Sequence, residues 1–239
     1  MPLTTLLRRT VPGPRHFLPA MLAASAVLAA CSSNNDNTTL TASAVGVISG
    51  NAQTGVAGGN LAVPFVVKVT DQNGAAMSGV TVNFTATAGA MLRSATATTD
   101  ANGQATDSVT IIGNVAGADT VTASVSGVAT SAIFSYTATA GAAAAITVVS
   151  GNNQSATAGT TLTAGLVVKV TDQFGNAVSG ATVDWTTTAG VLAGLAQTTT
   201  DASGQTTATL QLPALPGAAT VTATLDGTAT ATTFTETAM

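Results

Sequence analysis

Four aspartates recur at a fixed spacing, and their carboxylates are the best candidates in this chain for a catalytic or metal-binding role. Each begins the pattern Asp-x-x-Gly, which occurs at Asp71 and Gly74, Asp100 and Gly103, Asp172 and Gly175, and Asp201 and Gly204. Aspartate at the first position of a type I turn caps the backbone, and glycine three residues later accepts a positive φ. The alternative is a calcium site, which needs several converging oxygens, and the sequence has no dense Asp-x-Asp cluster to supply them. We therefore predict structural turns that hold no metal.

The remaining acidic residues of the body offer little for catalysis. They are not repeated: Asp107, Asp119, Asp184, Asp226 and Glu236. A glycoside hydrolase needs a facing pair of carboxylates, and nothing in the sequence brings two of these together. The only histidine, His16, and the only cysteine, Cys31, lie near the N-terminus, so the body lacks an imidazole or thiol for nucleophilic catalysis or zinc binding. We predict that the protein is not an enzyme and uses no cofactor or small-molecule substrate.

The first 30 residues are typical of an export signal. Three arginines precede the uncharged apolar stretch 18–30, which is shorter than the roughly 20 residues that a membrane span needs. Residues 28–31 spell Leu-Ala-Ala-Cys, which resembles the lipobox of bacterial lipoprotein precursors, where cleavage before the cysteine leaves that residue lipidated. An ordinary secretory signal is the alternative. We predict a lipoprotein signal peptide over 1–30 and a lipid anchor on Cys31.

The segment that follows Cys31 is predicted to be a tether. Residues 32–39 are polar and show no apolar period, which is typical of a flexible segment. We therefore predict that 31–41 comprise the lipidated cysteine and a flexible tether. In Gram-negative lipoproteins an aspartate directly after the lipidated cysteine commonly retains the protein in the inner membrane. This chain has Ser32 there, so the resemblance implies the outer membrane.

The charge of the chain argues against a nucleic-acid partner. Without the first 30 residues, three basic residues stand against ten acids, a net charge of 3 − 10 = −7. Phosphate binding needs clustered lysine and arginine side chains. We therefore expect no nucleic acid among the partners.

The body of the chain contains two copies of one module, module 1 (42–140) and module 2 (141–239). Residues 66–72 return unchanged at 167–173, an offset of 167 − 66 = 101. A repeat of about 100 residues can close a core of its own. Apolar residues alternate with polar ones in short runs separated by turn signals, which predicts half-buried antiparallel strands. We predict an all-β chain of two tandem two-sheet sandwiches.

Most aromatic residues are in phase with the inward face of these strands. The predicted core aromatics are Phe84, Phe134, Trp185 and Phe234. Stacking of Phe84 or Trp185 on a ligand is the alternative. Val109 and Ile111 are assigned to the inward face of one strand, and the copies differ in length by one residue after Ile111.

Phe174 does not follow this pattern. It occupies a turn in which module 1 has Asn73. An exposed aromatic residue at a loop tip is a candidate contact residue. We therefore single out Phe174 as the best candidate for contact with a partner.

The order of these motifs resembles the bacterial immunoglobulin-like domain, group 1, the repeat found in invasin and intimin. The matching stretches are Val-Lys-Val-Thr-Asp-Gln-x-Gly, Thr-Thr-Asp-Ala-x-Gly and Thr-Val-Thr-Ala, which recur in order over 42–138 and 143–238. The resemblance implies that both sandwiches are immunoglobulin-like. What matches is mainly the stalk of those proteins, so their receptor binding is not implied.

These features together predict a lipid-anchored protein of the bacterial outer membrane that faces the cell surface. The resemblance implies a role in adhesion or as a surface spacer. The expected partners are the membrane, through the lipid anchor, and a protein or glycan on another surface. The alternative is a periplasm-facing lipoprotein with a structural or protein-binding role in the envelope.

Overall fold

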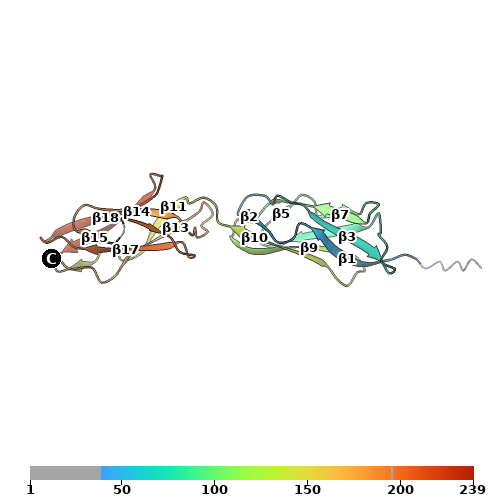
Figure 1. Ribbon diagram of the computed structural model, residues 1–239, viewed down its shortest axis with the longest axis horizontal. Coiled ribbons are helices and arrows are strands. Elements are labelled where there is room, and N and C mark those ends of the chain that lie inside the picture. Colours follow the sequence, from blue (N-terminus) through green and yellow to red (C-terminus); the bar gives the residue numbers. More distant parts are fainter. Residues whose placement is uncertain (1–38, 195) are drawn as a thin grey trace, which may run out of the picture. The chain divides into compact units, whose positions relative to one another are not determined.

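The computed structural model describes residues 39–194 and 196–239 (Figure 1). The predicted signal peptide, Cys31 and most of the tether lie outside these ranges. All regular elements in the described ranges are strands, as predicted for an all-β chain. In that part of the chain no helix is long and apolar enough to cross a membrane.

Module 1 is a two-sheet sandwich. Its strands are β1 (Ala42–Ser49), β2 (Gln53–Val56), β3 (Phe65–Asp71), β4 (Thr81–Ala86), β5 (Met91–Leu92), β6 (Thr96–Thr98), β7 (Gln104–Asp107), β8 (Val109–Ile111), β9 (Gly117–Val125) and β10 (Ala132–Thr139). One sheet has the order β2-β10-β9-β4-β6 and the other β1-β3-β7, with β5 and β8 as a separate pair. Neighbouring strands are antiparallel except β2 and β10, which are parallel.

Module 2 repeats this topology. Its strands are β11 (Ala145–Ser150), β12 (Ser155–Ala156), β13 (Leu166–Thr171), β14 (Thr182–Thr187), β15 (Val191–Ala193), β16 (Gln197–Thr199), β17 (Gln205–Gln211), β18 (Gly217–Leu225) and β19 (Ala231–Ala238). The two sheets have the orders β12-β19-β18-β14-β16 and β11-β13-β17-β15. Here a single strand, β17, takes the place of both β7 and β8, so β15 joins the smaller sheet.

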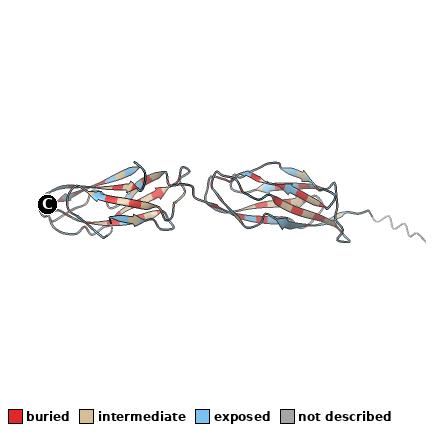
Figure 2. Ribbon diagram, turned by 45° about the horizontal axis from the view of Figure 1, so that its top comes forward, coloured by how far each residue is buried: buried red, intermediate tan, exposed pale blue. Residues whose placement is uncertain are grey.

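The core of each module is made by the inward faces of its two sheets (Figure 2). Burial alternates along β3, where Phe65, Val67 and Val69 are fully buried, and along β10, where every second residue is buried. Each module has its own cluster of buried side chains. This alternation confirms the strand period predicted from the sequence, because successive side chains of a strand point to opposite faces.

The two cores differ in side-chain volume at two equivalent positions, and the two differences have opposite signs. In module 1, Phe65 packs on Phe134 with ring centroids 4.7 Å apart. Module 2 has the smaller Leu166 in place of Phe65, but the larger Trp185 in place of Phe84, and Trp185 lies 6.0 Å from Phe234. Because protein interiors are close-packed, a larger side chain at one position is matched by a smaller one nearby.

The sequence-based assignment of Ile111 to the inward face is wrong. Strand β8 pairs Val109 with Leu92 and Ile111 with Met91, so Thr110 is bulged out. As a result Ile111 is 41% exposed, and the next residue, Ile112, is fully buried. A bulge inserts one residue and thereby reverses the faces of the residues that follow it. The length difference between the modules therefore lies at this bulge and not after Ile111.

The indole of Trp185 generates a prediction about core polarity. Its Nε1–H donates a 2.8 Å hydrogen bond to Oγ1 of Thr198, a position that is Ala97 in module 1. Thr198→Ala should lower the free energy of unfolding of module 2 by about 1–3 kcal/mol, because it leaves a buried N–H without an acceptor. In a Trp185→Phe background the same change should cost close to nothing. Denaturant unfolding followed by circular dichroism measures both, and an equal cost in the two backgrounds would contradict this account.

Candidate functional site

Each Asp-x-x-Gly segment folds as a turn that its aspartate closes. Oδ1 of Asp71 and of Asp100 accepts hydrogen bonds of 2.8–2.9 Å from the N–H groups two and four residues later. Asp172 and Asp201 make the same bonds at 2.8–2.9 Å. The glycines that end the turns have φ between +74° and +86°. Backbone donors therefore engage all four repeated carboxylates.

The second turn of each module lies directly against a neighbouring strand. The N–H of Val69 donates to the carbonyl of Gly103 at 2.8 Å, and a Cβ on Gly103 would lie 2.7 Å from the Val69 carbonyl oxygen. Gly204 and Val170 repeat this contact, at 2.6 Å for the added Cβ. Glycine is required here both by its positive φ and by the lack of space.

Asp107 is a buried acidic residue of module 1 that has no acidic equivalent in module 2. It is 4% exposed, and its Oδ1 accepts a 3.2 Å hydrogen bond from Ser94 N–H. Its Oδ2 has no hydrogen-bond partner among the described residues. Burial raises the pKa of Asp107, and two serine N–H groups and the charge of Arg93 offset part of that rise. The equivalent residue in module 2 is Ala208, so the shared fold does not require this carboxyl.

Asp119 and Tyr136 lie opposite each other on β9 and β10. Tyr136 is 1% exposed, and burial, together with the Asp119 charge, raises its pKa to about 12. The Tyr136 hydroxyl and Asp119 Oδ2 form no well-aligned hydrogen bond within the described chain. In module 2 the same pair of positions holds Ala219 and Glu236.

Glu236 is fully buried in module 2. Its Oε2 accepts a 2.6 Å hydrogen bond from the N–H of Gln154, whereas Oε1 has no partner in the described part of the chain. Burial raises the pKa of Glu236, and the N–H groups of Gln154 and Asn153 offset this only in part. Sequence patterning did not mark this residue as buried, since a lone glutamate in a Thr-rich strand is typical of a solvent-facing position.

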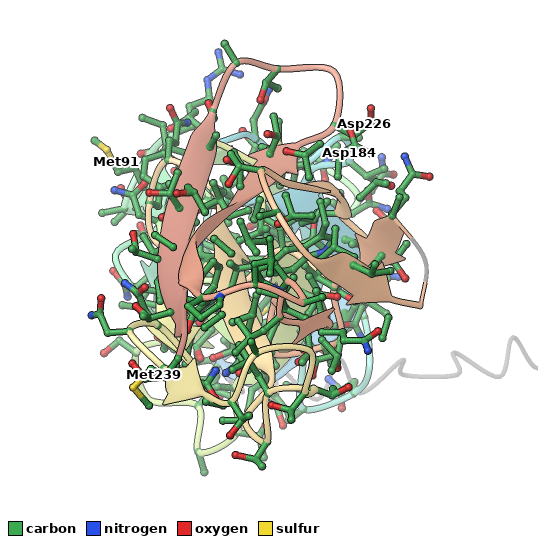
Figure 3. The ribbon with its side chains drawn as sticks, turned by 90° about the vertical axis from the view of Figure 1, so that its left-hand side faces the viewer. Met91, Asp184, Asp226 and Met239 are labelled. Atoms are coloured by element: carbon green, nitrogen blue, oxygen red, sulfur yellow. The ribbon has the colours of Figure 1, made fainter. Side chains whose placement is uncertain are left out.

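Asp184 and Asp226 lie at the periphery of module 2 (Figure 3). Oδ1 of Asp184 accepts a 2.9 Å hydrogen bond from Nε2 of Gln197. Asp226 borders a pocket of about 230 Å³ with Thr182 and Thr228. Over the described ranges, no three His, Cys, Asp or Glu side chains gather closely enough to hold a metal ion.

Phe174, the predicted contact residue, is 38% exposed and lies against the other module. Two of its ring atoms are 2.6 Å from the point where a Cβ on Gly58 would lie. Two residues later, Asn176 donates to the carbonyl of Asn114 and accepts from the N–H of Ala116, both at 2.8 Å. Sequence reasoning missed Asn176, although module 1 has Ala75 at this position, a difference that parallels the one between Phe174 and Asn73.

An apolar surface of module 1 was also missed. Met91 and Ile111 are paired across β5 and β8 and are 57% and 41% exposed. Beside them is a groove of about 420 Å³, lined by Phe84, Thr85, Ala86, Ala90, Met91, Leu92 and Ala95. Module 2 has Trp185 where the groove is lined by Phe84. The bulge that exposes Ile111 was the missing signal, and strand periodicity alone does not reveal a bulge.

The turn geometry generates a prediction about the stability of module 1. Asp71→Ala should lower the free energy of unfolding of module 1 by about 1–3 kcal/mol, because two N–H groups lose their acceptor. Asp71→Asn should cost less, since an amide oxygen also accepts.

The same geometry predicts that calcium does not bind at these turns. Addition of calcium, followed by a chelator, should leave the melting temperature of the protein unchanged. A rise in the melting temperature with calcium that Asp100→Asn or Asp201→Asn abolishes would show that these aspartates bind a metal ion.

Glu236 generates a prediction about pH. Its folded-state pKa is raised, so its stabilising contribution is present below the unfolded pKa and is lost as pH rises through the folded pKa. Module 2 should therefore lose stability relative to Glu236→Gln as the pH rises from 4 towards neutrality. Thermal unfolding of both proteins across this range measures the difference. A difference that does not change with pH would show that the buried carboxyl is not the cause.

Comparison with solved structures gives several similar chains, each aligned over most of this one. The D0-D1 domain of intimin is 21% identical, with 83% of this chain and 98% of that chain covered and a TM-score of 0.34. InvD of Yersinia pseudotuberculosis is 20% identical, with 83% and 57% covered and a TM-score of 0.49. Invasin, described as a bacterial integrin-binding protein, is 25% identical, with 84% and 40% covered and a TM-score of 0.37. No curated protein matches the chain.

The family comparison is the more specific result. The bacterial Ig-like domain (group 1) matches twice in tandem, over residues 45–137 and 145–237. Each match falls on one sandwich, and together they confirm the resemblance that the repeated motifs indicated. The chain belongs to the bacterial Ig-like domain (group 1) family.

Proposed function

We propose that this protein is a non-enzymatic lipoprotein of the bacterial outer membrane that acts in adhesion or as a surface spacer. The observation that carries the proposal is the combination of two tandem bacterial Ig-like modules with a lipobox-like sequence ending in Cys31. The modules supply two folded domains and the cysteine supplies an anchor. The repeated carboxylates serve turns, so the recurring polar chemistry of the modules is structural.

The lipid anchor is proposed to be permanent, and the anchored protein is proposed to face the cell surface. A lipidated cysteine carries more than one acyl chain, and each buried CH₂ contributes about 0.8 kcal/mol, so two or more chains hold a protein on a membrane stably. Ser32 supports transfer to the outer membrane, and the polar segment 31–41 supports separation of module 1 from the lipid.

The proposed partner is a protein or glycan on another surface. The acidic chain disfavours polyanions. The edge strand β1 of module 1 exposes Val47 and Ile48, at 38% and 50%. An exposed strand edge with apolar side chains can pair with an extended segment of another protein, which favours a protein over a glycan.

Protease treatment of intact cells tests surface display. Added protease should remove residues 40–239 while a periplasmic marker stays intact. Ser32→Asp, the matched variant, should retain the protein in the inner membrane and protect it. Full protection of the native protein until the outer membrane is opened would favour the periplasm-facing alternative.

Mass spectrometry of the membrane-bound protein tests the anchor in the same preparation. Cys31 should be the N-terminal residue and should carry acyl chains, and Cys31→Ala should release the protein from the membrane fraction or leave it uncleaved. An unmodified Cys31 in the native membrane protein would contradict lipid anchoring.

A further inference from the structure

The turn between β13 and β14 reaches from module 2 to module 1. Leu40–Met239 form one compact unit, and within it the Phe174 ring lies on the backbone of Gly58. A Cβ at Gly58 would lie 2.6 Å from two ring atoms, closer than van der Waals contact permits. The ring therefore occupies space that exists only because residue 58 is glycine.

The side chain of Asn176 makes two hydrogen bonds to one loop of module 1. Its Nδ2 donates to the Asn114 carbonyl and its Oδ1 accepts from the Ala116 N–H, each at 2.8 Å. An amide side chain that is bonded at both ends specifies orientation as well as distance. The apolar contact of Phe174 and this paired contact lie two residues apart on the same turn.

Asp172 connects the same turn to the segment that joins the modules. Its Oδ2 accepts from Asn176 Nδ2 at 2.9 Å and from the N–H of Gly141 at 2.8 Å. Burial would raise the pKa of Asp172, but its hydrogen bonds, from the Asn176 side chain and three backbone N–H groups, outweigh burial and lower it. The carboxylate thus stays charged at neutral pH and holds Gly141 beside the turn.

Module 1 provides an internal comparison. Its equivalent turn has the same Asp71 hydrogen bonds but carries Asn73 and Ala75 in place of Phe174 and Asn176. The turn itself therefore requires neither residue. On the receiving side, Gly159 is the module 2 equivalent of Gly58, and nothing lies within 4 Å of a Cβ placed on it.

We propose that Phe174 and Asn176 form a docking site for the preceding Ig-like module and that this site holds the connecting segment 141–144 in place. Modules joined by a short linker move relative to one another unless an interface restrains them. This role separates Phe174 from ligand binding, because its ring already has a partner within the chain. The proposal does not depend on lipid anchoring or on adhesion.

Proteolysis of the full chain within 141–144 tests the proposal. Elastase cleaves after small residues, and this segment is Gly-Ala-Ala-Ala. Phe174→Asn with Asn176→Ala, which introduces the residues of module 1, should make cleavage between the modules several-fold faster, since cleavage follows the population of the open form. Gly58→Asn, which displaces the ring from the other side, should have the same effect.

Two matched controls separate docking from general loosening. Asn73→Phe with Ala75→Asn changes the equivalent turn of module 1, and Gly159→Asn changes the equivalent glycine of module 2; both should leave the cleavage rate at the native value. NMR relaxation should give one rotational correlation time for the native modules and two for the docking variants. Native cleavage rates and a single correlation time in both docking variants would overturn the proposal, as would equal acceleration by the controls.

Discussion

Each module depends on the packing of two sheets across a core that contains few aromatic residues. Aromatic residues make up 3% of the chain, so valine, alanine and leucine fill most of the space of about 10 Å between the sheets. Such a core has little freedom to absorb a change in volume. Where module 2 carries Trp185 for Phe84, it also carries Leu166 for Phe65 and adds Thr198 as a partner for the indole. The two modules are thus two solutions to one packing constraint.

Polar groups divide according to whether they are repeated. The repeated aspartates close turns, and backbone N–H groups use their carboxylates in both modules. The unrepeated groups include Asp107, Tyr136 and Glu236, which are buried with at least one atom that has no hydrogen bond within the described chain. Burial of an unsatisfied polar group costs stability. At these positions the two modules hold different residues: module 2 has Ala208 for Asp107, and Ala219 and Glu236 for Asp119 and Tyr136.

The turn between β13 and β14 shows how one element serves two purposes. Asp172 closes the turn as Asp71 does, while Phe174 and Asn176 direct its outer face to module 1. A surface that contacts a neighbouring module is removed from the surface open to other molecules. The exposed apolar residues of module 1, among them Met91 and Ile111, lie elsewhere and retain that freedom.

The sequence by itself determined the repeat, the strand period and the four turns. These features are local: alternation of apolar residues sets the buried face of a strand such as β3, and Asp-x-x-Gly closes a turn through bonds within five residues. The order of the repeated motifs also indicated the family, because each motif marks a strand or turn of the same sandwich.

Only the tertiary structure decided which residues meet across long separations. The bulge at Thr110 depends on pairing with β5, and it moved Ile111 to the surface and Ile112 into the core. Glu236 is buried because β19 lies inside its sheet, between β12 and β18, with the side chain facing the core. Phe174 contacts Gly58 while remaining 38% exposed, because the two modules meet there. For Ile111 and Phe174 the deciding neighbour is distant in sequence, so no local pattern records it, whereas the alternation that places Phe234 inward also places Glu236 inward.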